Sequence, residues 1–112
     1  MSKYGNRKVF VGAMAFDSRL EARRYHELLL MQKAGIICDL KTQVPFILQP
    51  SFKKGGKTIR AITYKADFVY TVCGTGEIVV EDTKGFRTEV YNIKKKIFEY
   101  KYPELTIKEV KK

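Results

Sequence analysis

The sequence has 112 residues, of which 22 are Lys or Arg and 12 are Asp or Glu, and its formal net charge is +10. This length predicts a single domain over residues 1–112, and a hydrophobic content of 45% excludes a disordered basic tail. The charge predicts a polyanionic partner, nucleic acid before a membrane surface. With no run near the ~20 apolar residues of a membrane span, and only two Cys and one His, we expect a cytoplasmic protein without a membrane partner.

The first elements in chain order are a small extended segment and a helix. Two short apolar stretches within residues 8–16 predict a hairpin or a packed arm. Ser18 and Glu21 then form a capping box, in which each side chain satisfies a free backbone N–H of the first helical turn. Apolar residues follow at helical spacing, and the pattern predicts a helix over 18–34.

The middle of the chain changes from helical spacing to alternation, and it predicts strands separated by turns rich in glycine. The predicted strands cover residues 42–52, 58–71 and 77–84, with turns at 53–57 and 73–76. Two prolines in the first of these strands indicate an edge strand or a bulged one.

A second helix is predicted after Thr88, which can cap it, and before Pro103. Its apolar residues at spacings of three and four are Val90, Ile93, Ile97 and Tyr100. A last short strand is predicted over 105–110. The core order is therefore αβββαβ, and the crossover through the second helix predicts a mixed sheet flanked by helices, an α/β (α+β) fold.

Charge is distributed unevenly along this layout. No acidic residue occurs from Leu40 to Ala66, while six basic residues do: Lys41, Lys53, Lys54, Lys57, Arg60 and Lys65. A hairpin with this excess of positive charge is a candidate arm for contacting phosphates.

Two acidic residues occur where solvated charge is not expected. Asp67 lies in the middle of an apolar strand, and Asp82 follows the apolar run that ends at Val80. Because strand side chains alternate, Asp82 and Lys84 share a face with Val80, whereas Glu81 points the other way. A meander would place Asp67 beside Asp82, and a divalent cation is the usual remedy for two adjacent carboxylates.

This arrangement resembles the PD-(D/E)XK, or restriction-endonuclease-like, nuclease superfamily, whose core is αβββαβ. It is most similar to short phage and prophage proteins of that superfamily and, more distantly, to archaeal-type Holliday junction resolvases. The likeness runs through Tyr4–Asn6, Phe16–Ser18, Glu21–Tyr25, Ile59–Tyr64, Ala66–Phe68 and Val80–Gly85. The residue before the motif Asp is commonly Pro in the superfamily and is Ala66 here.

The resemblance implies an endonuclease-type hydrolase that needs Mg²⁺ or Mn²⁺. By this resemblance Asp67 and Asp82 bind the metal, with Glu21 and the backbone carbonyl of Thr83 as further ligands. Lys84 would orient or deprotonate the attacking water. A capping role alone also accounts for Glu21, and both interpretations stay open.

The expected partner is DNA, cleaved according to its structure rather than its sequence, because no segment resembles a base-reading module. The residues expected to bind it are Lys53, Lys54, Lys57, Arg60, Lys65, Arg87, Lys94 and Lys95. The alternatives are a basic nucleic-acid-binding module without catalysis and a nuclease-fold component of a phage replication, recombination or packaging assembly. The sequence leaves open DNA versus RNA, endo- versus exonuclease action, and whether the chain forms a homodimer.

Overall fold

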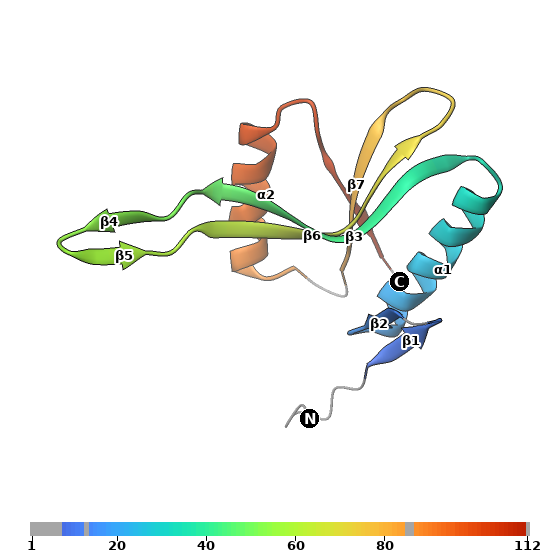
Figure 1. The fold of residues 1–112 in the computed structure, drawn as a ribbon, viewed down its shortest axis with the longest axis horizontal. Coiled ribbons are helices and arrows are strands. Elements are labelled where there is room, and N and C mark those ends of the chain that lie inside the picture. Colours follow the sequence, from blue (N-terminus) through green and yellow to red (C-terminus); the bar gives the residue numbers. More distant parts are fainter. Residues whose placement is uncertain (1–7, 13, 85–86, 112) are drawn as a thin grey trace.

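A computed structural model describes residues 8–12, 14–84 and 87–111, and it contains eight strands and two helices (Figure 1). The sequence segments Tyr4–Asn6 and Gly85, used above for the family resemblance, lie outside the described residues. In chain order the elements are β1 (Val9–Val11), β2 (Met14–Phe16), α1 (Arg19–Lys33), β3 (Ile37–Gln49), β4 (Phe52–Lys54), β5 (Lys57–Ile59), β6 (Ile62–Val72), β7 (Ile78–Thr83), α2 (Glu89–Lys101) and β8 (Ile107–Val110).

The central element is a four-stranded mixed sheet in the order β3-β6-β7-β8. The first three strands form an antiparallel meander, and β8 lies parallel to β7 after the crossover through α2. This confirms the predicted α+β class and the mixed sheet. β3 is an edge strand with two register shifts, in agreement with the edge or bulged strand predicted there, although only Pro45 of the two prolines lies within it.

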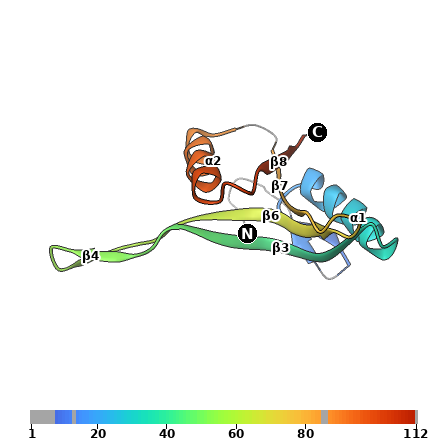
Figure 2. The same cartoon turned by 90° about the horizontal axis from the view of Figure 1, so that it is seen from above.

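The strand boundaries differ from the prediction in the long hairpin. β3 begins at Ile37, five residues before the predicted start, because the chain turns directly from α1 into the strand at Gly35 (φ +78°). The strand predicted over 58–71 is two strands, β5 and β6, interrupted at Arg60 and Ala61. β4 and β5 therefore form a separate small hairpin that extends beyond the sheet (Figures 1 and 2).

Both helices begin at the predicted caps. The Ser18 hydroxyl accepts a hydrogen bond from the Glu21 N–H at 3.1 Å, and the Thr88 hydroxyl accepts one from the Tyr91 N–H at 3.0 Å. The face that α2 buries is different from the apolar stripe noted in the sequence. Tyr91 and Phe98 are buried, whereas three members of that stripe are exposed: Val90, Ile93 and Tyr100.

The hydrophobic core divides into two clusters, one under each helix. The α2 cluster contains the buried residues Leu48, Tyr64, Ala66, Val80, Tyr91, Phe98 and Ile107. The α1 cluster contains Phe16, Ala22, Leu28, Ile37, Phe68 and Tyr70. In Figure 2 the two helices lie toward opposite ends of the long β3–β6 ribbon. Because Ala66 belongs to one cluster and Phe68 to the other, Asp67 lies at the boundary between them.

Candidate functional site

The strand register brings Asp67 and Asp82 together. Phe68 lies opposite Glu81 in the β6–β7 ladder, and the next position along each strand is Asp67 on β6 and Asp82 on β7. Asp67 Oδ2 accepts two hydrogen bonds of 2.8 Å from Thr83, one from its N–H and one from its hydroxyl. The Thr83 contacts therefore fix the Asp67 carboxylate at the end of β7, beside Asp82.

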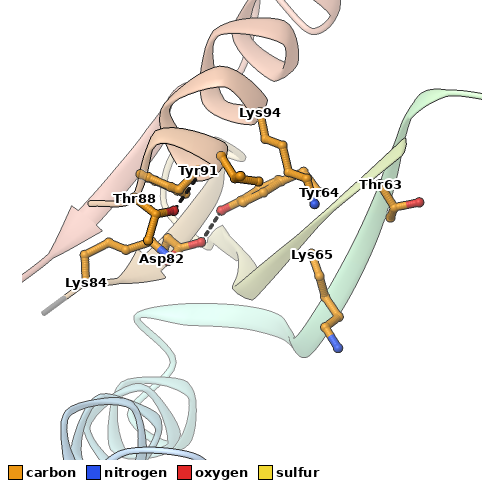
Figure 3. A pocket seen from close by; sticks show the side chains of 9 residues that line it. Thr63, Tyr64, Lys65, Asp82, Lys84, Thr88, Tyr91 and Lys94 are labelled. Carbon is orange, nitrogen blue, oxygen red and sulfur yellow. Dashed lines mark hydrogen bonds and ion pairs between the residues drawn. The ribbon is translucent and has the colours of Figure 1, made fainter. Parts of the chain in front are cut away.

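Asp82 is the most enclosed acidic group of the site, with 2% of its surface exposed. Its Oδ2 accepts a hydrogen bond of 2.5 Å from the Tyr64 hydroxyl, which Figure 3 shows as a dashed line. Its Oδ1 lies 2.8 Å from Lys84 Nζ, as an ion pair. Lys84 is thus the charged partner of this buried oxygen. Burial raises the pKa of Asp82, and the contacts with Lys84 and Tyr64 partly offset the rise.

Glu21 approaches the two aspartates from α1. The residue is buried, and its Oε2 accepts a hydrogen bond of 2.6 Å from the Gln43 side chain on β3. Burial raises the pKa of the Glu21 carboxyl to about 7, and the nearby negative charges of Asp67 and Asp82 add to the rise. The Glu21 side chain thus faces the sheet, while its backbone N–H donates the capping hydrogen bond to Ser18.

Gln43 and Tyr64 are site residues that the sequence reasoning missed. Gln43 has a left-handed backbone (φ 53°), a conformation that costs free energy in a non-glycine residue. Tyr64 is one of the alternating buried residues of β6, with Ala66, Phe68 and Tyr70, and this alternation is typical of an ordinary core strand. The sequence did offer one signal for Tyr64, because a tyrosine on the same strand as Asp67 needs a hydrogen-bond partner for its hydroxyl when it is buried. Nothing in the sequence indicated Gln43.

A pocket of about 500 Å³ opens beside Asp82 and Lys84, between β6 and the first turns of α2 (Figure 3). Its lining residues are Thr63, Tyr64, Lys65, Asp82, Lys84, Thr88, Val90, Tyr91 and Lys94. Lys84 Nζ lies 4.1 Å from the centre of the Tyr91 ring, a cation–π contact that adds to its ion pair. Lys65, Lys84 and Lys94 are therefore part of the lining of a cavity that has a buried carboxylate in its wall.

The predicted DNA-binding residues divide into three groups. Lys65 and Lys94 line the pocket. Arg87 and Lys95 form ion pairs within the chain, with Glu109 at 2.8 Å and with Glu99 at 2.9 Å. The exposed bases of the β4–β5 region make up the third group: Lys53, Lys54, Lys57 and Arg60.

Glu81 points away from Asp82, as the alternation predicted, and it has a structural partner. The residue is fully buried, and its carboxylate receives two hydrogen bonds from the Arg24 guanidinium, at 2.8 and 2.7 Å. The Tyr70 hydroxyl donates a further hydrogen bond to it. This network ties α1, and with it Glu21, to the strand that carries Asp82.

The carboxylates that could hold a metal ion at this site are those of Asp67 and Asp82. Within residues 8–12, 14–84 and 87–111, no group of three or more His, Cys, Asp and Glu side chains is placed to hold a metal ion. Glu21 is accordingly not placed as a third ligand. Two carboxylates are nonetheless a common protein contribution to Mg²⁺, which keeps several waters and binds substrate phosphates. The buried Oδ1 of Asp82 already faces a positive charge, the Lys84 ammonium group at 2.8 Å, and as a carboxylate oxygen it has the chemistry of a Mg²⁺ ligand.

Neither of the two helices in the described part of the chain is long and apolar enough to span a membrane. The whole sequence, residues 1–112, matches the family model described as "Protein of unknown function (DUF1064)", and the chain belongs to that family. Searches of curated proteins and of solved structures gave no significant match.

Proposed function

We propose that this member of the DUF1064 family is a Mg²⁺- or Mn²⁺-dependent DNA phosphodiesterase with a restriction-endonuclease-like core. The observation that carries the proposal is the pairing of Asp67 and Asp82 on adjacent strands, with Lys84 2.8 Å from Asp82 at the mouth of a lysine-lined pocket. A protein that only binds nucleic acid has no use for two adjacent acids there, because their charge repels phosphate.

Asp67 and Asp82 would hold the cation, together with the Thr83 carbonyl and water. A bound Mg²⁺ or Mn²⁺ supplies positive charge at the scissile phosphate and makes a nearby water more acidic. The chain prepares its ligands without the ion, because Thr83 fixes Asp67 and Tyr64 fixes Asp82 through hydrogen bonds. Such fixed carboxylates lose little rotamer entropy on binding.

Lys84 would bind the phosphate and orient the attacking water. Its ammonium group has three donors, and the contact with Asp82 leaves others free to face the pocket. The Tyr91 ring holds the Lys84 side chain from the α2 side. Lys65 and Lys94 on the pocket lining would contact flanking phosphates. Glu21, with a pKa near 7, can take up a proton close to the two aspartates at neutral pH.

A non-catalytic nucleic-acid-binding module is the second candidate. The observation in its favour is the lack, over the part of the chain that the structure describes, of a three-carboxylate group placed for a metal. In that case the Lys84–Asp82 ion pair is structural, and the basic surface alone binds DNA.

A substrate panel separates the two functions. Linear, nicked, single-stranded and branched DNAs are incubated with the purified protein in Mg²⁺, in Mn²⁺ or in chelator. The phosphodiesterase predicts cleavage of at least one substrate, dependent on metal and lost in Lys84→Ala. Asp39→Asn is the matched control, because Asp39 is an exposed acid on β3 whose left-handed backbone (φ 55°) Asn tolerates. Metal-independent binding without cleavage of any substrate would favour the second candidate.

A further inference from the structure

The β4–β5 hairpin, residues 52–59, is here called the arm. Its two strands pair in the register Phe52–Ile59, Lys53–Thr58 and Lys54–Lys57. The turn between them is Gly55-Gly56, both with positive φ (58° and 77°), as a tight hairpin turn requires. All six strand residues are exposed, and the arm projects from the end of the sheet (Figures 1 and 2).

A hairpin of this kind is stable only marginally without something to pack against. The arm nevertheless carries a cross-strand apolar pair, with Phe52 44% and Ile59 40% exposed. Because side chains alternate along each strand, this pair shares one face of the arm with Lys54 and Lys57. The same face therefore presents apolar surface near its base and two ammonium groups at its tip.

The charge of the arm selects its partner. Lys53, Lys54 and Lys57 lie on it and Arg60 follows it, and no acidic residue occurs between Asp39 and Asp67. A surface with positive charge alone fits a polyanion better than a second copy of this chain, whose net charge is +10. The width of a two-stranded ribbon matches the major groove of B-form DNA, which also offers thymine methyl groups to apolar side chains.

We infer that the arm is a β-ribbon that docks in the major groove of duplex DNA next to the pocket at Asp82, with Phe52 and Ile59 against base edges near its base and with the flexible side chains of its lysines reaching the phosphates that border the groove. The placement of the cleavage point beside this duplex rests on the proposed function; the docking itself does not. The substrate class is then DNA with a double-stranded segment on one side of the reacting phosphate. An A-form RNA duplex is a poor partner, because its major groove is too narrow for side chains to read.

The distance along the chain from the tip of the arm to Asp67, through the first half of β6, sets how much duplex is needed. Eleven residues separate Gly56 at the tip from Asp67. At a rise of about 3.3 Å per residue they span about 36 Å. With about 3.4 Å per base pair, this corresponds to roughly 10 bp of duplex. The overall extents of 53 × 41 × 24 Å accommodate this length along the longest axis.

The test measures binding in chelator, so that it does not depend on cleavage. Forked DNAs with constant single-stranded tails and duplex segments of 4 to 16 bp are titrated by fluorescence anisotropy. The arm predicts that affinity increases with duplex length up to about 10 bp and then levels off. The variant lacking residues 52–59 should show no such length dependence. The deletion leaves a four-residue loop, Pro50, Ser51, Arg60 and Ala61, between the paired residues Gln49 and Ile62.

Point variants keep the test valid if the deletion variant does not fold. Replacing Lys53, Lys54 and Lys57 with Ala should reduce the slope of log K against log salt by up to ~2.7, because each phosphate contact contributes ~0.9. The matched control removes three exposed bases elsewhere: Arg23, Lys33 and Lys108. Replacing Phe52 and Ile59 with Ala should weaken binding about five- to tenfold without changing the slope, since half-exposed apolar side chains lose part of a full transfer free energy.

The outcomes separate this inference from the proposed function. Length-dependent binding without any cleavage would support the arm and contradict the phosphodiesterase. Cleavage with affinity independent of duplex length, or equal affinity for RNA duplexes, would overturn the arm's role. A sedimentation shift from dimer to monomer in the Phe52→Ala, Ile59→Ala variant, with DNA affinity unchanged, would instead assign the arm to self-association and also overturn it.

Discussion

Divalent cations should stabilise this protein against unfolding, and Asp82→Asn should remove that effect. The structure places two carboxylates on adjacent strands, and one of them, Asp82, is buried with a positive group, the Lys84 ammonium, beside it. An ion that binds the folded state alone adds RT ln(1 + [L]/Kd) to the free energy of unfolding. At ten times the dissociation constant this is about 1.4 kcal/mol.

The expected shift in melting temperature follows from the chain length. An unfolding entropy of ~2.1 cal/mol/K per residue, over 112 residues, makes 1.4 kcal/mol equivalent to roughly 6 °C. Differential scanning fluorimetry in chelator and in millimolar Mn²⁺ measures it. The rise is compared within each variant, because Asn at Asp82 also removes the buried ion pair with Lys84 and alters the metal-free midpoint.

Asp39→Asn serves as the control, and it should keep the full rise. An unchanged wild-type midpoint in Mn²⁺ would refute a preformed site at Asp67 and Asp82. An equal rise in the wild type, Asp82→Asn and Asp39→Asn would show that the cation binds elsewhere.

Three further predictions concern groups around the site. Tyr64→Phe removes the hydrogen bond to Asp82, so it should lower the free energy of unfolding by about 1 kcal/mol and reduce the Mn²⁺-induced rise in melting temperature. If denaturant titration and scanning fluorimetry show neither change, Tyr64 does not position Asp82. Arg24→Met leaves the fully buried Glu81 charge without its ion-pair partner and should cost about 3 kcal/mol in urea unfolding, where a loss below 1 kcal/mol would argue against that network. Glu21 has a raised folded-state pKa of about 7, so the folded metal-free protein binds more protons than the unfolded chain between pH 4.5 and 7. The free energy of unfolding should therefore fall as pH rises through this window, and it should fall less steeply in Glu21→Gln. Parallel profiles of unfolding free energy against pH for the wild type and Glu21→Gln would contradict the raised pKa of Glu21.

The sequence predicted the parts of the site that depend on local rules. Capping residues located both helices, and strand alternation placed Asp82 and Lys84 together on one face. The short turn between two strands was enough to place Asp67 beside Asp82, because a meander of this kind fixes the pairing of its strands.

Tertiary features decided the rest. Gln43 has a left-handed backbone within β3 that no residue pattern indicates, and its side chain donates a hydrogen bond to Glu21 on α1. The buried face of α2 was ambiguous in the sequence, because the helix has apolar residues on more than one of its faces. In the structure the face with Tyr91 and Phe98 is the buried one. Glu81 required Arg24, 57 positions earlier in the chain, for its ion pair, a separation that spacing arguments do not cover.

The cleavage activity of Asp67→Asn tests the central claim most directly. Asn keeps the shape of Asp67 and can still accept a hydrogen bond from Thr83, but it removes the charge that attracts a cation. The wild type and the variant are assayed on forked and branched DNA with Mn²⁺, and their metal-free DNA affinities are measured on the same preparations. We expect no cleavage by the variant and DNA binding equal to or tighter than that of the wild type, because a charge that repels phosphate is gone. Cleavage by Asp67→Asn at the wild-type rate would contradict the assignment of this site.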